Sequence, residues 1–429
     1  MTQSQPAIKS LAHVQTPGAA IAKLLDTNPA DLSWQETFYT WLHSHPELSE
    51  QEEQTALAIR ERLAHYTCTI SRPMGGHGLV ATMSNGEGPT ILSRADFDAL
   101  PVTENTGVSY ASTVRTIGRD GKETGVMHAC GHDMHTTALL GAVAILDATR
   151  DHWSGTFHAL FQPAEEVTAG ARAMIDDGLA DEISRPDICL GQHILPGKAG
   201  TIMSMPGPIL TACDSITVTI HGTSSHASSP HESVDPIYVA AHIILRLQGI
   251  VGREVDPDDF AVVSIGQIHA GNSNNSIPDT ATLTLNCRFY NTEVRDSVYA
   301  AIERVVKGEC MASGCPREPD ISYWAHGELT VNDPTVFTHV RETFNAVFGD
   351  DSIDAQRWTA SEDFSEIPRH FGVPYLFWIA GITPDDQWAQ RHDTPVPANH
   401  MPTFLPDLST ITSTTKAAAA APLSFLFKG

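Results

Sequence analysis

Short apolar runs alternate with helix-like segments over residues 75–205, and this alternation constrains the fold more than any other feature of the sequence. The strand-like runs are residues 78–83, 90–95, 156–161 and 187–190. The helix-like segments are residues 136–149 and 169–175. Strands that alternate with helices are typical of an α/β domain whose sheet is mostly parallel.

A different pattern occupies the middle of the chain. Its predicted strands and helices follow in the order β-α-β-β-α-β, over residues 215–221, 236–247, 261–269, 280–290, 293–307 and 320–324. This order is that of a ferredoxin-like domain. The α/β character then resumes, with predicted helices over residues 335–348 and 408–426 and a predicted strand over 374–379. The sequence therefore predicts a discontinuous α/β domain of residues 1–208 and 327–429, with an inserted ferredoxin-like α+β domain of residues 209–326.

The N-terminal region is less regular. Residues 1–30 predict a polar, loosely held leader. A helix is expected from Ser33 to Trp41, before the break at His45-Pro46-Glu47. Ser49 is followed three residues later by Glu52, the capping-box pattern, which predicts that a second helix begins at Ser49.

Composition excludes two classes of partner. Lys plus Arg number 26 and Asp plus Glu number 51, so 26 − 51 gives a net charge of −25 with histidine neutral. A surface this acidic repels phosphates, so we expect binding neither to nucleic acid nor to anionic membranes. Residues 1–20 lack the apolar core of a signal peptide, and no apolar run approaches the ~18 residues of a membrane helix. The seven cysteines are odd in number and irregularly spaced, which indicates a reduced compartment and predicts a cytoplasmic protein.

The densest group of reactive side chains lies in Met127–Thr136. It holds His128, Cys130, His132 and His135. In an extended segment Cys130 and His132 share a face, so both could reach one metal ion. A thiolate can also bridge two ions. A structural zinc site and an inert buried cysteine stay open as alternatives.

Paired carboxylates follow two of the predicted strands. Asp96 and Asp98 point the same way in an extended segment, so one of them could orient a ligating histidine. Glu165 and Glu166 are neighbours, and on an extended chain they point to opposite sides. One could bind a cation while the other moves protons.

Two isolated histidines complete the candidate set. His193 follows an apolar run and His400 lies in Asn399-His400-Met401-Pro402. One cysteine, several histidines and a glutamate pair give nitrogen, sulfur and oxygen ligands suited to Zn²⁺, and Mn²⁺ or Co²⁺ are not excluded. The ligands suffice for two ions.

The inserted domain carries its own polar residues. His226 and Asn275 could donate hydrogen bonds to a developing oxyanion, and Arg288 could bind a carboxylate. Spacing alone favours ordinary loop chemistry for these residues.

Taken together, these motifs resemble the M20 metallopeptidase family. The resemblance is to its amidohydrolase branch, which includes hippurate hydrolases, indole-acetyl-amino-acid hydrolases and bacterial N-acyl-amino-acid aminoacylases. Residues 94–107 look most similar to aminoacylases such as the N-acyl-glutamine type. The matching segments are residues 45–49, 94–101, 128–136, 162–166, 193, 230–231, 235–236, 275–279, 361–364 and 400.

The resemblance implies a fold and a role for each matching residue. It implies a catalytic domain of the zinc-exopeptidase type with an inserted lid and dimerisation domain, and two divalent ions, Zn²⁺ or Mn²⁺, per subunit. Cys130 would bridge the ions, and His132, Glu166, His193 and His400 would complete their ligands. Glu165 would be the general base, and Asp98 would support the ligands from behind. His226 would stabilise the oxyanion, usually from the partner subunit of a homodimer, and Asn275 and Arg288 would contact the substrate carboxylate.

Two departures from the family pattern affect the lid. Ser224 and Ser225 stand where the family usually has two glycines, and Asn286-Cys287 stands where Gly-Thr is common. The leading hypothesis is a dinuclear metal-dependent hydrolase that cleaves the amide bond of small N-acyl amino acids. The alternatives are a thiol amidase with Cys130 as nucleophile and a metal-binding dimer that has lost catalysis.

Overall fold

The protein divides into two compact units. The computed structural model describes residues 17–27, 29–118 and 121–428. The first unit comprises the described residues up to Ile209, together with Val331–Arg357 and those from Asp363 onward. The second comprises Leu210–Thr330 and Trp358–Glu362. The segment 358–362 belongs to the second unit because Leu210 forms a β-bridge with Trp358, and the Thr211 N–H donates to the Ala360 carbonyl at 2.9 Å.

The first unit is built on an eight-stranded sheet with the order β1-β2-β6-β3-β7-β18-β8-β17. Its strands are β1 (Thr69–Ile70), β2 (Leu79–Asn85), β3 (Thr90–Asp96), β6 (Gly155–Gln162), β7 (Ile188–Lys198), β8 (Ile202–Ser204), β17 (Ser352–Asp354) and β18 (Tyr375–Thr383). The four central strands β6, β3, β7 and β18 are parallel, whereas β2 and β8 are antiparallel to their neighbours β6 and β18. The predicted α/β class with a mostly parallel sheet is confirmed.

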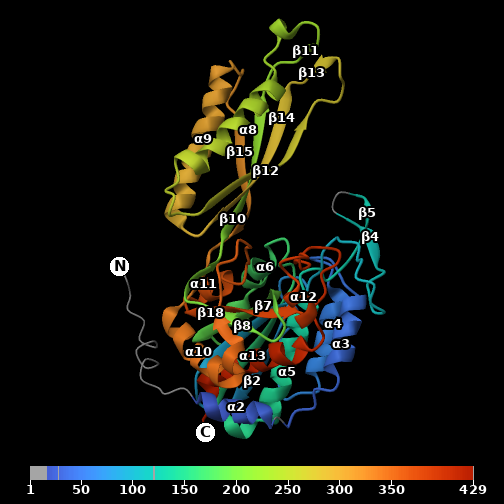
Figure 1. Ribbon diagram of the computed structural model, residues 1–429, viewed down its shortest axis with the longest axis vertical. Coiled ribbons are helices and arrows are strands. Elements are labelled where there is room, and N and C mark those ends of the chain that lie inside the picture. Colours follow the sequence, from blue (N-terminus) through green and yellow to red (C-terminus); the bar gives the residue numbers. More distant parts are fainter. Residues whose placement is uncertain (1–16, 28, 119–120, 429) are drawn as a thin grey trace. The chain divides into compact units, whose positions relative to one another are not determined.

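Helices pack against this sheet (Figure 1). Those in contact with its strands are α5 (His132–Ala148), α6 (Gly170–Asp176), α10 (Pro334–Phe348), α11 (Glu366–Phe371), α12 (Asp385–Ala389) and α13 (Thr410–Leu426). Helices α2 (Gly18–Asp26), α3 (Gln35–Ser44), α4 (Glu53–Leu63) and α7 (Leu179–Glu182) pack on these helices. Helix α5 is buried almost along its whole length, between β3 and α13. The row of small residues Ala417–Ala421 on α13 is also buried, and small side chains let two helices approach closely. This packing fixes the first turn of α5, which carries the candidate ligand His132 and begins two residues after Cys130.

Two predictions for the N-terminal region are wrong. Residues 18–26 form helix α2, which buries Ile21 and Leu25, instead of a loose leader, and residues 1–16 lie outside the described part. Helix α4 begins at Glu53 rather than at Ser49. The Glu47 carboxylate accepts from the N–H groups of Gln54 and Thr55 at 3.1 and 2.7 Å, so a glutamate outside the helix satisfies its first turn.

The second unit has the predicted β-α-β-β-α-β order. Its elements are β10 (Ala212–His221), β11 (Ser225–His226), α8 (Pro236–Arg253), β12 (Ala261–Ala270), β13 (Ser276–Ile277), β14 (Thr280–Phe289), α9 (Thr292–Ala312) and β15 (Asp320–Gly327). The four long strands form an antiparallel sheet with the order β12-β14-β10-β15, and β11 pairs with β13. Helices α8 and α9 lie side by side on one face and share an apolar core with the sheet (Figure 1).

Short pairs of strands complete the described structure. They are β4 (Arg115–Ile117) with β5 (Glu123–Gly125), and β9 (Gly207–Leu210) with β16 (Thr330–Asn332). Among the described residues, no helix combines the length and apolarity needed to span a membrane.

Candidate metal centre

The candidate ligands of the first unit come together where its parallel strands end. Asp96 ends β3, and Glu165 and Glu166 follow β6. His193 lies on β7, two residues beyond Gly191, where the pairing of β7 with β3 ends. Side chains that follow neighbouring parallel strands meet at one edge of a sheet, where α/β proteins place their sites. Cys130 and His132 flank Gly131, the N-cap of α5, so Cys130 precedes the helix and His132 is its first residue.

A tight turn presents these two residues, and it is not the extended segment that the sequence predicts. Gly131, the N-cap of α5, is left-handed with φ of 83°. A Cβ atom there would lie 2.2 Å from Cδ1 of Ile194. Only glycine adopts this conformation readily and also leaves room for Ile194. Cys130 and His132 nevertheless converge, because the turn brings both side chains to the same side.

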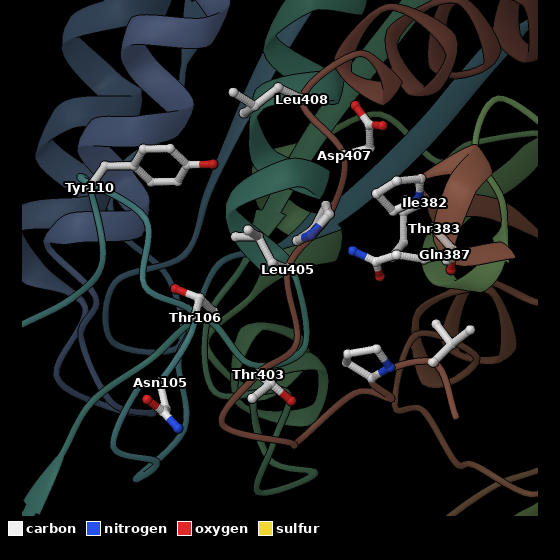
Figure 2. A pocket seen from close by; sticks show the side chains of 14 residues that line it. Asn105, Thr106, Tyr110, Ile382, Thr383, Gln387, Thr403, Leu405, Asp407 and Leu408 are labelled. Carbon is white, nitrogen blue, oxygen red and sulfur yellow. The ribbon is translucent and has the colours of Figure 1, made fainter. Parts of the chain in front are cut away.

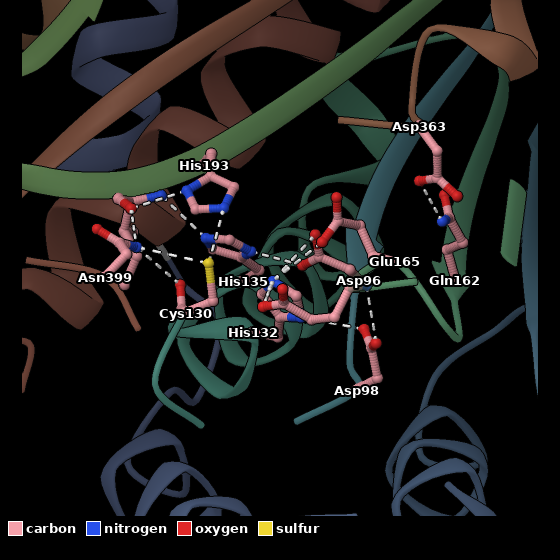
Figure 3. Close-up of polar contacts among 12 residues, drawn as sticks. Asp96, Asp98, Cys130, His132, His135, Gln162, Glu165, His193, Asp363 and Asn399 are labelled. Atoms are coloured by element: carbon pink, nitrogen blue, oxygen red, sulfur yellow. Dashed lines mark hydrogen bonds and ion pairs between the residues drawn. The ribbon is translucent and has the colours of Figure 1, made fainter. Parts of the chain in front are cut away.

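The centre of the cluster is the ring of His132 (Figure 3). Its Nδ1 lies 3.2 Å from Oδ1 of Asp98, so the aspartate holds the ring from behind. Its Nε2 is buried and has no hydrogen-bond partner within the described part of the chain. That nitrogen faces carboxylate oxygens of Asp96, Glu165 and Glu166 at 3.6, 3.8 and 3.7 Å. A buried nitrogen aimed at oxygens beyond hydrogen-bond distance is what a metal ligand without its ion presents.

Cys130 belongs to two candidate ligand groups. Its Sγ lies 3.6 Å from Nε2 of His193, whose Nδ1 donates to the Ile194 carbonyl at 2.8 Å and leaves Nε2 as a ligand atom. Ligand atoms of Cys130, His132 and His193 lie within 4.8 Å of one another, and so do those of Cys130, Glu166 and His400. The thiol therefore stands where it could be shared by two ions.

The two adjacent glutamates do not point to opposite sides, as the sequence predicts. Strand β6 has ended at Gln162, and Ala164 is left-handed with φ of 51°, so the chain is bent rather than extended. Both carboxylates therefore face His132. The Glu166 N–H also donates to Oδ2 of Asp98 at 3.1 Å, which couples this turn to the support of His132.

A buried polar network lies behind the ligands. The Arg94 guanidinium donates to Asp96, Gln162 and Asp363 at 2.6, 2.8 and 3.1 Å. The other oxygen of Asp96 binds Nδ1 of His135 at 2.5 Å, and Nε2 of His135 accepts from the Ile194 N–H at 2.9 Å. The network fixes the strand ends that carry the ligands.

The electrostatics of the cluster suit a divalent cation. Burial raises the pKa of Glu166 to about 8 and the pKa of the Cys130 thiol well above its usual value. Burial also opposes ionisation of Asp96, but Arg94, His132 and His135 hold its pKa well below the usual range. A bound cation would favour the ionised forms of both Glu166 and Cys130. The sulfur, nitrogen and oxygen donors, together with the partnerless His132 Nε2 and Glu166 Oε1, fit such an ion.

Replacing Gly131 by alanine is expected to lower the free energy of unfolding. The left-handed backbone costs an L-residue about 1–2 kcal/mol. Displacing the buried Ile194 adds about 1–3 kcal/mol. Urea denaturation of the metal-free protein measures the change. Gly76→Ala is the control, since Gly76 has φ of 94° but nothing within 4 Å of its Cβ position, and it should show only the backbone part. Equal losses in the two variants would contradict the role given to Ile194.

In the second unit, His226 and Asn275 lie together. His226 pairs with Ser276 across β11 and β13, and the Ala227 N–H donates to the Asn275 carbonyl at 2.9 Å. The Ser228 N–H donates to Nδ1 of His226 at 3.1 Å. Because Nδ1 accepts, the neutral ring carries its proton on Nε2, which makes that atom a donor.

Arg288 is not part of this pair. It lies near the far end of β14, opposite Cys213 of β10 and Val262 of β12. Its guanidinium donates to Asn286 and Ser361 at 3.0 and 2.5 Å. Within one copy of the second unit, His226 and Asn275 therefore lie at one site and Arg288 lies at another.

The first unit also holds a cavity of about 390 Å³ (Figure 2). It lies beside the segment that follows His400, and no proposed metal ligand lines it. Polar and apolar side chains mix in its wall: Asn105, Thr106, Tyr110, Ile382, Thr383, Pro384, Gln387, Val396, Pro397, Thr403, Leu405, Pro406, Asp407 and Leu408.

Several residues of the cluster lie in segments that the sequence analysis named but were given no role at the site. Asn399 donates toward Sγ of Cys130 at 3.6 Å and to the Cys130 carbonyl at 3.3 Å. Ser49, expected to cap a helix, donates to Oδ2 of Asp98 at 2.7 Å instead. Asp363 reaches Arg94 over 269 residues of sequence. The adjacent His400 could have indicated Asn399, but no local pattern indicates the partners of Ser49 and Asp363.

Comparison with known proteins gives a consistent result. Residues 92–405 match the model of peptidase family M20/M25/M40. The chain is 36% identical over 381 residues to the N-acetyl-L-cysteine deacetylase of Bacillus subtilis, covering 87% of this chain and 88% of that one. It is 35% identical over 327 residues to the hippurate hydrolase of Campylobacter jejuni, covering 75% and 82% of the two chains.

A solved structure is similar over nearly the whole chain. The YXEP protein of Bacillus subtilis, described as a dinuclear metal binding peptidase from the M20 family, matches with a TM-score of 0.70 and 29% identity. The match covers 94% of this chain and 98% of that one. The chain therefore belongs to peptidase family M20/M25/M40, in its amidohydrolase branch.

Proposed function

We propose that the protein hydrolyses the amide bond of small N-acyl amino acids with two divalent ions, releasing a carboxylic acid and a free amino acid. The observation that carries this proposal is Cys130 shared by two ligand groups, with the carboxylate of Glu165 beside His132. The names of the relatives, a deacetylase of N-acetyl-L-cysteine and a hippurate hydrolase, support this substrate class.

The residues that would hold the ions are Cys130, His132, Glu166, His193 and His400. Their donor atoms suit Zn²⁺ or Mn²⁺. When bound, divalent ions supply Lewis acidity that polarises an amide carbonyl and lowers the pKa of water. Oδ1 of Asp98 lies 3.2 Å from Nδ1 of His132 and holds the ring in place, so that Nε2 faces Glu165 and Glu166.

Glu165 is the proposed general base. Its side chain is almost buried, and its Oε2 lies 3.8 Å from Nε2 of His132, so it stands beside the ligands. A carboxylate in this position can take a proton from the attacking water and pass it to the leaving amine. One residue then serves both halves of the reaction.

His226, Asn275 and Arg288 are proposed to act on the substrate. The Nε2–H of His226 is the donor suited to a developing oxyanion. Asn275 and Arg288 would bind the substrate carboxylate. Arg288 lies near the end of β14, whereas His226 lies on β11 and Asn275 directly before β13. A partner subunit that supplies His226 and Asn275 would let all three residues act on one substrate.

A homodimer through the second unit is part of the proposal. Strand β12 is an edge of its sheet and is exposed over most of its second half. Ile268 on β12 and Tyr238 and Leu245 on α8 are exposed by 50, 62 and 71%. An unpaired edge next to exposed apolar side chains is typical of an interface. The seven free cysteines support the further proposal of a cytoplasmic protein.

Replacing His226 by asparagine is expected to lower kcat by about 10²-fold with little change in KM, because a donor to the oxyanion acts mainly in the transition state. Steady-state kinetics on the best N-acyl amino acid measures both constants. His65→Asn replaces an exposed histidine outside every matching segment in the same way, and this control should keep full activity. An unchanged kcat in His226→Asn would remove this residue from the mechanism.

The proposal is tested by measuring free amine from a panel of substrates. The panel holds N-acetyl, N-benzoyl and long-chain N-acyl forms of several amino acids, with unacylated dipeptides as the comparison. Release from N-acyl amino acids above release from dipeptides supports the proposal. Release from dipeptides alone would indicate a peptidase, and no release from the panel would indicate a metal-binding protein that has lost this catalysis.

One observation favours a second candidate function. Sγ of Cys130 lies 3.6 Å from Nε2 of His193, as in a thiol nucleophile with its base. However, burial above all, together with the neighbouring Glu166 and Glu165, raises the pKa of the Cys130 thiol and opposes a free thiolate. A thiol amidase would resist chelators and lose activity on thiol alkylation.

A further inference from the structure

A histidine outside the proposed ligand set sits between two buried carboxylates. His43, on α3, places Nδ1 at 2.7 Å from Oδ2 of Asp133 and Nε2 at 3.1 Å from Oε1 of Glu104. All three side chains are fully buried. The His43 ring also packs edge-on against Tyr110, which lines the cavity of Figure 2, with ring centroids 5.4 Å apart.

The hydrogen bonds fix the charge of this ring. Ionised carboxylates only accept hydrogen bonds, so contacts at both ring nitrogens require a proton on each. His43 is then an imidazolium between two anions. Burial opposes that charge, but the bonds to Asp133 and Glu104 outweigh it and raise the pKa of His43 to about 9.

His43, Asp133 and Glu104 come from three separate parts of the chain, which their hydrogen bonds join. Glu104 lies between β3 and β4 and also accepts from the Thr106 hydroxyl and, at 2.6 Å, from the Ser112 N–H. Asp133 follows His132 in the first turn of α5, and its Oδ1 accepts from the Met134 N–H at 2.8 Å. Glu104 is therefore held by the loop, whereas Asp133 is held by the turn that presents Cys130 and His132.

We infer that His43 is a positioning residue for the metal centre, acting through Asp133 to hold the turn that presents Cys130 and His132. The inference rests on the proposed metal centre and deepens it. Outer partners of metal ligands typically change metal affinity or activity 10–100-fold when they are replaced. Here His43 would support the ligand His132 through the next residue in the chain, Asp133, and not through a hydrogen bond to the His132 ring itself.

Two replacements of His43 separate positioning from packing. In asparagine the amide nitrogen stands close to the position of Nδ1, so His43→Asn keeps a donor for Asp133. In glutamine the amide nitrogen stands close to the position of Nε2, so His43→Gln keeps a donor for Glu104 only. Both variants lose the same charge and the same ring.

The measurement is the affinity of the metal-free, full-length protein for Zn²⁺, by competition with a chromophoric chelator. Circular dichroism and thermal unfolding of the metal-free variants report folding. We expect His43→Gln to weaken Zn²⁺ binding by at least about 10-fold and His43→Asn to stay close to the wild type. Equal affinities in the two variants would overturn the inference.

A second pair covers the case in which neither His43 variant folds. Asp133→Asn and Glu104→Gln each neutralise one side of His43 while keeping the size of the side chain. Only Asp133→Asn should weaken Zn²⁺ binding, and equal effects would again overturn the inference. If the wild-type protein binds no Zn²⁺, the proposed centre fails as well, and the two failures are thereby told apart.

Discussion

Replacing Glu165 by glutamine is expected to lower kcat for N-acyl amino acid hydrolysis by about 10²–10⁴-fold, the usual contribution of a general base. Glutamine keeps the size of the side chain but accepts no proton. Because Glu165 is not among the proposed ligands, metal content measured on the purified variant should stay at the wild-type level. The combination of full metal and lost turnover is the expected result.

The exposed Glu53, on α4 of the same unit, provides the control. Glu53→Gln should retain both metal and activity. Full activity in Glu165→Gln would end the proposed role. Loss of metal together with activity would instead assign Glu165 to the ligands, leaving the base to another group.

Replacing His132 by glutamine is expected to abolish metal binding and activity together. His132 is the buried ring that faces three carboxylates, and its Nε2 has no hydrogen-bond partner among the described residues. Without it, a bound ion loses a ligand and the carboxylates lose a neighbouring ring that can carry positive charge. We expect Zn²⁺ affinity to fall by at least about 100-fold, the upper end of the effect of outer partners.

The exposed His152 of the same unit serves as the control, since His152→Gln removes an imidazole without touching the cluster. Metal content by mass spectrometry and amine release measure the two effects. A His132→Gln variant that keeps its metal would contradict the assignment of this residue as a ligand.

Local patterns predicted much of the fold because each depends on near neighbours. The run 90–95 became β3, and the helical periodicity at 236–247 became the first part of α8, whose N-cap Asp235 accepts from the N–H groups of Ile237 and Tyr238. The order of elements in the second unit also followed from the spacing of apolar residues, which recur every two residues in strands and every 3.6 residues in helices. The capping of α4 did not, because Glu47 reaches it from outside the helix.

The candidate site was predictable by residue type more than by geometry. Cysteine, histidine and glutamate in Cys130, His132 and Glu166 indicated a metal, but the turns that join them depend on the left-handed Gly131 and Ala164. The supports lie far away in sequence: Asp363 is 269 residues from Arg94, and His43 is 90 residues from Asp133. Such contacts follow from tertiary packing, which spacing along one chain does not encode.

The central claim is that the cluster around His132 hydrolyses amides with bound divalent ions. The most direct test measures amine release from the best N-acyl amino acid in three states: as purified, after a chelator, and after Zn²⁺ or Mn²⁺ is added back. The account predicts activity that chelation removes and that one of the two ions restores. Full activity in the chelated protein, with its metal content shown to be nil, would contradict it.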